Sequence, residues 1–336
     1  MAARGCVREV ALDLWSHAGE WAGKSNLTAH DDENDHASSS SSPPSFLIAT
    51  VMWFTVLLPY VGLVALVAWT WLAALSPFDL ACLAVSYLAI GFGVTVGYHR
   101  LLAHRAFTTW RWLEVVLLIL GCMAMQGPPV RWAATHRRHH QRSDHDGDPH
   151  SPHHHGDGVR GFVRGLWHAH TGWLLRQDAT DTARSCTDML ASPVVRFVDR
   201  YYAVWLALSV LVPFALGAIV KGSFVGGLVT VLWATALRIA LMHHATWSVN
   251  SICHLFGYRS FQSGDGSRNN PVVALLSLGE GWHNNHHAFP TSARHGLRWY
   301  EFDASYVLIR SLELLGMAWD VRIPSLAARR AKAAVS

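Results

Sequence analysis

The chain has 336 residues, of which 51% are hydrophobic and only 15% are charged, and its formal net charge is +4. Soluble domains carry about a quarter charged residues, so this composition excludes a mainly disordered chain and argues against an ordinary soluble enzyme. The positive net charge suggests an anionic partner. Because the basic residues are spread among apolar stretches, that partner is expected to be a membrane surface and not nucleic acid.

Polar and apolar stretches alternate along the chain as in multi-pass membrane proteins. Residues 1–45 form a polar N-terminal tail, which ends in a serine run and two prolines and is expected to be disordered. Four apolar stretches follow, each long enough to cross a bilayer, for which about 20 residues suffice. The expected membrane spans are residues 46–75, 80–98, 202–220 and 224–243.

A further apolar stretch, residues 112–125, is too short to cross a bilayer and is expected to form an interfacial or packed helix. With four crossings, the histidine-rich segments share one side with both chain ends. Thirteen arginines lie on that side between His99 and Arg200, so it is expected to be cytoplasmic. The sequence therefore predicts an all-α integral membrane protein with four transmembrane helices. A cytosolic helical cap is expected to comprise residues 99–200 and 244–322, with 323–336 as a C-terminal tail.

Histidine is the unusual residue of this chain, with 22 copies. An HxxxxH pattern closes the second span, HxxHH follows the short apolar stretch, NSxxH follows the fourth span, and a second HxxHH comes later. Positions i, i+3 and i+4 share a helix face, so each HxxHH is expected to aim three imidazoles at one point. The candidate ligands are His99, His104, His136, His139, His140, His254, His283, His286 and His287, with Asn250 on the same helix face as His254.

The number and type of these side chains indicate two metal ions. Nine imidazoles exceed the ligand set of one zinc ion, which takes about four. Nitrogen ligation with open positions suits iron that binds oxygen, although imidazole also suits zinc and copper. His99 and His104 diverge by about 140° on an ideal α-helix, so their convergence requires that the helix bend or end between them. Helix geometry alone leaves that pair open.

The ordered set of patterns resembles the membrane fatty acyl desaturases of the acyl-CoA (stearoyl, delta-9) type. The resemblance covers about residues 46–322 and is closest to the bacterial branch. The resemblance extends beyond the histidines to neighbouring residues, in the motifs DPH at 148–150, HTGW at 170–173, NSICHLFG at 250–257 and GEGWHNNHHAFP at 279–290. An HxxHH alone is a weak signal, whereas this ordered set is specific.

The resemblance implies a metal centre of two iron ions held by the nine histidines, with Asn250 holding a metal-bound water. It implies that O2 and two electrons are used to insert a cis double bond, at the delta-9 position, into the saturated chain of an acyl-CoA, with an acyl-lipid as the alternative substrate. The residues that shape the bend of the family's acyl tunnel correspond here to Gln126, Trp132 and Thr246. For Trp132 and Thr246, packing at the membrane interface is an equal alternative.

No fused electron carrier is recognisable, so the expected donor is a ferredoxin, a rubredoxin or a cytochrome b5-like protein with its reductase. The expected location is the bacterial inner membrane, with both termini and the metal site in the cytoplasm.

Two other classes of protein compete with this interpretation. A membrane di-iron hydroxylase or ketolase uses similar histidine patterns, but the four-residue spacing in the first pattern and the NSxxH element argue against it. A metal transporter would place ionisable ligands near the middle of its spans, whereas here they lie at the ends.

Overall fold

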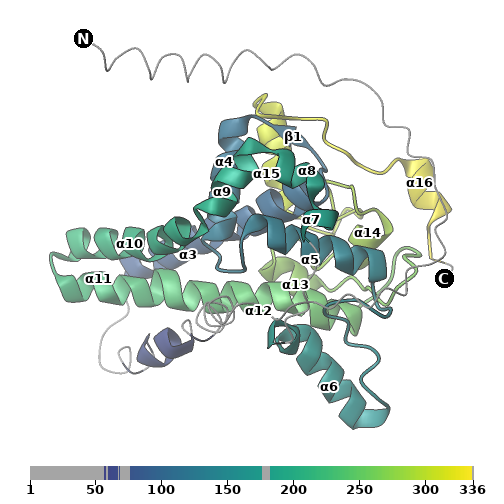
Figure 1. Cartoon of the computed structure of the whole chain (residues 1–336), viewed down its shortest axis with the longest axis horizontal. Coiled ribbons are helices and arrows are strands. Elements are labelled where there is room, and N and C mark those ends of the chain that lie inside the picture. The colour runs from purple at the N-terminus through teal and green to yellow at the C-terminus, as the bar shows by residue number, and fades with distance from the viewer. Residues whose placement is uncertain (1–56, 58–59, 67, 69–75, 176–181, 335–336) are drawn as a thin grey trace. The chain divides into compact units, whose positions relative to one another are not determined.

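The computed structural model describes residues 57, 60–66, 68, 76–175 and 182–334, and the described chain is mostly helical (Figure 1). The predicted N-terminal tail and most of the first predicted span lie outside the described residues. A small antiparallel pair joins β1 (Thr108–Thr109) to β2 (Ala318–Trp319).

Three helical segments are long and apolar enough to cross a membrane, and they contain the second, third and fourth predicted spans. The first is α3 (Pro77–Phe92) continued by η1 (Gly93–Ala103), and the second is α10 (Tyr202–Lys221). The third joins α11 (Phe224–Val231), η3 (Leu232–Leu237), α12 (Arg238–Ser251) and η4 (Ile252–His254). In Figure 1, α10 and α11 lie side by side, joined by a tight turn at Gly222, whose positive φ of 64° suits glycine.

A buried carboxylate joins these segments at the end remote from the histidines. Asp79, in the first turn of α3, lies 2.5 Å from the Lys221 Nζ and accepts a hydrogen bond of 2.7 Å from the Thr230 hydroxyl. Because the carboxylate pairs with a cation and accepts a hydrogen bond from a hydroxyl, the free-energy cost of burying its charge is compensated. The contact fixes α3 to the α10–α11 turn.

The short apolar stretch forms α4 (Arg111–Cys122), whose 12 residues are fewer than a crossing helix needs, in agreement with the prediction. It packs so closely on η1 that side chains are excluded from the contact. A Cβ on Gly93 would lie 2.2 Å from the Gly121 nitrogen, and one on Gly97 would lie 2.8 Å from the Leu117 carbonyl oxygen. This close approach fixes the position of η1, which carries His99 and ends directly before His104.

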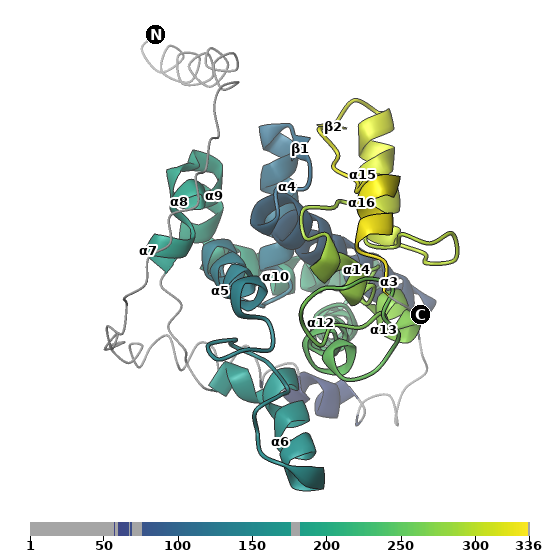
Figure 2. The same ribbon diagram turned by 90° about the vertical axis from the view of Figure 1, so that its right-hand side faces the viewer.

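The shorter elements gather around the histidine-bearing ends of the long segments (Figures 1 and 2). These elements are α5 (Pro129–Arg142), α6 (Gly158–His170), η2 (Gly172–Leu175), α7 (Thr182–Ser185), α8 (Thr187–Ala191), α9 (Pro193–Arg200), α13 (Pro271–Leu276), α14 (His283–Ala288), α15 (Ala304–Leu314) and α16 (Leu326–Ala331). The cytosolic helical cap stays a prediction.

Candidate metal centre

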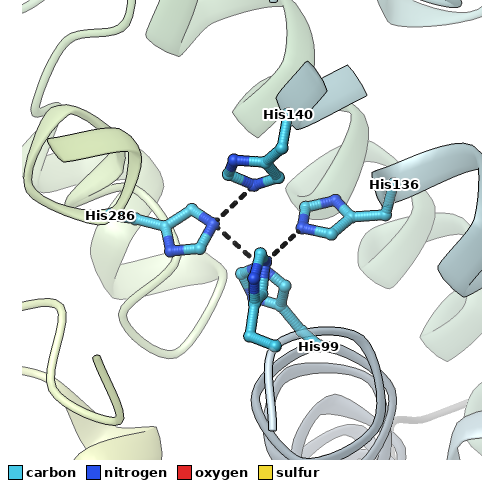
Figure 3. Close-up of side chains that lie close together, drawn as sticks. His99, His136, His140 and His286 are labelled. Atoms are coloured by element: carbon cyan, nitrogen blue, oxygen red, sulfur yellow. Dashed lines mark hydrogen bonds between the residues drawn. The ribbon is translucent and has the colours of Figure 1, made fainter. Parts of the chain in front are cut away.

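The nine candidate histidines gather into two neighbouring clusters. In each cluster, one ligand nitrogen per histidine lies within 4.8 Å of all the others. Figure 3 shows four members of the first cluster pointing toward a common centre. The five-histidine cluster contains His99, His104, His136, His140 and His286. The four-histidine cluster contains His139, His254, His283 and His287.

The convergence of His99 and His104, which the sequence left open, results from the π-helical geometry of η1. The His104 N–H donates to the His99 carbonyl at 3.1 Å, an i to i+5 bond. A π-helix joins residues five apart by a hydrogen bond and turns them toward the same side, whereas an α-helix separates them by about 140°. The two ring centroids are accordingly 4.8 Å apart.

Each HxxHH pattern is divided between the two clusters, so the expectation that its three imidazoles aim at one point is wrong. On α5, His136 and His140 face the five-histidine cluster while His139 faces the other. On α14, His286 belongs to the five-histidine cluster, whereas His283 and His287 belong to the four-histidine cluster. Adjacent helical residues diverge by about 100°, which lets one turn supply ligands to both sides.

Within the clusters, Nε2 atoms face one another at short distances. In the five-histidine cluster, the Nε2 of His286 lies 3.0 Å from that of His99 and 2.9 Å from that of His140. In the four-histidine cluster, the Nε2 atoms of His254 and His283 are 3.0 Å apart.

Four of the imidazoles present their other nitrogen to a buried carboxylate. The Nδ1–carboxylate oxygen distances are 2.5 Å for His99–Glu280, 3.0 Å for His139–Asp148, 2.8 Å for His254–Asp144 and 2.5 Å for His287–Asp265. An ionised carboxylate accepts the Nδ1–H and thereby fixes the tautomer that leaves the Nε2 lone pair free. These carboxylates were not predicted from the sequence, although Asp148 and Glu280 lie inside the DPH and GEGW motifs.

This donor set fits metal binding. Because His139 and His287 both direct Nδ1 to a carboxylate, their Nε2 lone pairs face each other across 3.3 Å. Two lone pairs at that distance repel unless a cation lies between them. Carboxylate–histidine pairs of this kind orient the ligands of protein metal sites.

Burial and mutual proximity keep three of these imidazoles neutral. Burial, and then the neighbouring imidazoles, hold the pKa values of His136, His140 and His286 well below the ordinary 6.5. Burial alone would raise the pKa of Glu280, but His99 and Arg100 hold it well below its usual range. Neutral imidazoles beside ionised carboxylates are the states that a metal site requires.

These shifts predict that the metal-free protein loses stability in mild acid. An unfolded histidine titrates near pH 6.5, whereas His136, His140 and His286 stay neutral below that pH, so at these sites the unfolded chain binds more protons as the pH falls. We expect the apparent unfolding temperature of the metal-free protein in detergent to be lower at about pH 5.5 than at about pH 7.5. The exposed His145 makes no side-chain contact within the described residues, and a His145→Gln variant should show the same trend. A stability that is constant or rises toward pH 5.5 would contradict the assignment of these histidines as buried and neutral.

A buried ion network that the sequence did not reveal borders the five-histidine cluster. Arg100 is fully buried, and its Nη2 lies 3.1 Å from Glu280 and 3.0 Å from Asp303. Its Nη2 is also 3.2 Å from the Nδ1 of His295, whose ring lies 4.4 Å from that of His286. His295 is therefore a tenth histidine at the centre, and it belongs to no spaced pattern that sequence reasoning recognises.

Asn250 lies one turn before His254 on α12 and is half-buried. Within the described residues its side chain makes no hydrogen bond. Its role in holding a metal-bound water stays a prediction.

The three candidate substrate residues form one hydrogen-bonded chain beside the five-histidine cluster. The Gln126 Nε2 donates to the Thr246 hydroxyl at 2.9 Å, and the Trp132 Nε1 donates to the Gln126 Oε1 at 3.2 Å. The Trp132 ring stacks on His136 with centroids 5.1 Å apart. The structure thus brings together residues that are 120 positions apart and places them against candidate ligands.

Comparison with known proteins identifies the relatives of this chain. The family model for fatty acid desaturases matches residues 70–316. Over 270 residues the chain is 42% identical to hex-5-enoyl-[acyl-carrier protein] acetylenase of Moorena producens (strain JHB), covering 80% of this chain and 84% of that protein. It is 41% identical over 254 residues to sn-1 stearoyl-lipid 9-desaturase of Anabaena variabilis, covering 74% and 86%. It is 39% identical over 242 residues to acyl-CoA 5-desaturase AL21 of Anemone leveillei, covering 70% and 68%.

Proposed function

The chain belongs to the fatty acid desaturase family, and we propose that it inserts a cis double bond at the delta-9 position of a saturated acyl chain. The reaction removes two hydrogens from adjacent methylenes and, with two further electrons and two protons, reduces O2 to two water molecules. The observation that carries this proposal is the pair of buried histidine clusters beside the Gln126–Thr246 contact.

We propose that the two clusters hold two iron ions through the nine histidines, with Asn250 acting through a water. When bound, the irons supply the O2 chemistry that no side chain offers for an unactivated methylene. The chain's own residues orient and enclose that centre. Glu280, Asp144, Asp148 and Asp265 fix imidazole tautomers. Burial excludes water from six of the nine ligands, which are His99, His139, His254, His283, His286 and His287.

The hydrogen-bonded chain of Gln126, Trp132 and Thr246 supports a role in placing the acyl chain. Because Trp132 stacks on a candidate ligand, any group that contacts its free edge lies close to the metal centre. The Thr246 hydroxyl donates to a carbonyl of the preceding turn of α12, and the Gln126 amide fixes its position from the other side. A rigid polar contact here suits a bend in an apolar tunnel, because it resists displacement by the chain.

Reshaping this contact should change the product and not the chemistry. We expect Thr246→Leu or Trp132→Phe to move the double bond or the preferred chain length, since rate and position depend on placing one methylene pair within about 1 Å of the centre. The measurement is the location of double bonds by mass spectrometry of derivatised fatty acids. Thr246→Ser, which keeps the hydroxyl, is the matched control. Unchanged products in both Thr246→Leu and Trp132→Phe would assign these residues to packing alone.

Two acyl carriers are candidates. The sequence patterns resemble those of acyl-CoA desaturases, and one relative is named an acyl-CoA 5-desaturase. The relative named a stearoyl-lipid 9-desaturase shares slightly more identity with this chain and favours an acyl-lipid. Purified protein supplied separately with stearoyl-CoA and with a stearoyl-lipid distinguishes the two.

We propose that electrons come from a separate ferredoxin, rubredoxin or cytochrome b5-like protein with its reductase. We further propose a multi-pass arrangement in a bacterial inner membrane, with both termini and the metal centre in the cytoplasm. The three apolar segments support the membrane location, and the arginines between His99 and Arg200 support the orientation.

The decisive experiment expresses the intact chain in a desaturase-deficient host and analyses total fatty acids with double-bond location. We expect a new cis-9 monoene that is absent from cells expressing His286→Ala. A hydroxylated chain in place of the alkene would establish the hydroxylase alternative. An unchanged profile with iron-loaded protein and each donor class supplied would refute the desaturase proposal.

A further inference from the structure

The C-terminal segment, which the sequence suggested is only a tail, packs on the loops around the metal centre. After β2, the Arg322 N–H donates to the Ala106 carbonyl at 2.9 Å, and the Arg322 carbonyl accepts from the Ala293 N–H at 2.8 Å. The residues that follow, 325–334, are termed the strap and include α16. Figures 1 and 2 show α16 near α14.

The strap is attached to the residue that follows a candidate ligand. The Lys332 Nζ donates to the Ala288 carbonyl at 2.7 Å and lies 5.3 Å from the centre of the Phe289 ring. Ala288 follows His287 directly. One lysine thus fixes the backbone at the end of α14 by a hydrogen bond and a cation–π contact.

The strap also pairs with a loop edge, as a short antiparallel bridge between Phe261 and Ala333. The Gln262 N–H donates to the Lys332 carbonyl at 2.8 Å, and the Ala334 N–H donates to the Ser260 carbonyl at 3.0 Å. Residues 260–262 are therefore held from outside by the C-terminal segment.

The same loop edge is held from inside by Asn284, which lies between two candidate ligands. Its fully buried amide accepts from the backbone N–H groups of Ser260 at 2.8 Å and Phe261 at 2.9 Å, and it donates to the Phe261 carbonyl at 2.9 Å. Residues 260 and 261 therefore lie between the strap and α14.

This loop continues to the carboxylate that orients His287. Asp265 accepts from the Ser263 hydroxyl at 2.7 Å, and its other oxygen lies 2.5 Å from the His287 Nδ1. The next N–H, of Gly266, donates at 2.7 Å to Asp144, which orients His254. The loop thus supports two of the four ligands in the four-histidine cluster.

We propose that the strap is a positioning element of the metal centre, which holds the Asp265 loop and the end of α14 and so retains the metal of the four-histidine cluster. This inference rests on the proposed function, because it requires that the clusters bind metal. Lys332 is its principal positioning residue. The five-histidine cluster serves as an internal reference, because His286 is its one member on α14 and its carboxylate, Glu280, precedes that helix.

The test measures metal release from the full chain loaded with Fe2+ and mixed anaerobically with a colour-forming chelator. We expect two kinetic phases, and the phase absent from His283→Ala belongs to the four-histidine cluster. Lys332→Met should speed this phase by about 10-fold, which corresponds to the lower end of the loss in metal affinity when a partner that supports a ligand is removed. Truncation after Pro324 should speed it further, and the other phase should stay within about twofold of the wild type.

Arg330→Met is the matched control, because Arg330 is exposed on the same helix and makes no side-chain contact within the described residues. Lys332→Arg, which keeps the cation, should release metal at nearly the wild-type rate. Release from Lys332→Met and from the truncated chain at the wild-type rate would overturn the strap while leaving the metal centre intact. Equal acceleration of both phases would also overturn it, because that indicates general destabilisation. A wild-type chain that binds no metal would overturn both proposals.

Discussion

His286→Ala should reduce turnover to background while the protein still inserts into membranes. The His286 Nε2 is close to the Nε2 atoms of both His99 and His140, so its removal opens the five-histidine cluster at its centre. Loss of a ligand's outer partner already costs about 10–100-fold, and loss of the ligand itself should cost more. If the two clusters each hold one iron, as proposed, bound iron should fall from about two ions per chain to about one.

The matched control is His145→Ala, which removes an exposed imidazole from the loop after α5. That variant should keep its iron and its turnover. Fatty acid composition and iron content are measured on the same membrane preparations. Together they distinguish a loss of catalysis from a loss of inserted protein. Retained turnover in His286→Ala would refute the ligand assignment.

Which histidines approach one another could be predicted, but how they divide into two clusters could not. The spacing of His136, His139 and His140 shows that they lie on one side of a helix, because that follows from the helical repeat. Which histidines of α5 and α14 enter which cluster depends on how the two helices are placed relative to each other. No local sequence pattern encodes that placement. The same limit applies to His99 and His104, whose convergence requires the π-helix that packs on α4.

The supporting carboxylates show a second limit of sequence reasoning. Asp144 orients His254 from 110 residues away, and Asp265 orients His287 from 22 residues away. A single acidic residue in a polar loop gives no signal of such a partner. The apolar spans were predictable because length and composition decide whether a helix can cross a bilayer, and three of them correspond to described segments.

Arg100→Met should destabilise the protein strongly, because it removes the cation from a fully buried ion network. Glu280 and Asp303 would then lie buried without their positive partner. Removing one partner of such a pair costs about 3–5 kcal/mol, mostly because the remaining charge is left uncompensated. Since Glu280 also orients His99, we expect less iron in the five-histidine cluster as well as a lower unfolding temperature in detergent.

Arg105→Met tests whether burial causes this effect. Arg105 also pairs with a carboxylate, Asp188, but its side chain is 61% exposed, whereas that of Arg100 is 0% exposed. Water screens such a surface pair, which is worth about 0–1 kcal/mol, so its loss should barely lower the unfolding temperature. Arg100→Lys should fall between the two, because lysine restores the charge without the planar fork that reaches both carboxylates. Equal effects of Arg100→Met and Arg105→Met on the unfolding temperature would show that burial of the ion network is not the cause of the destabilisation.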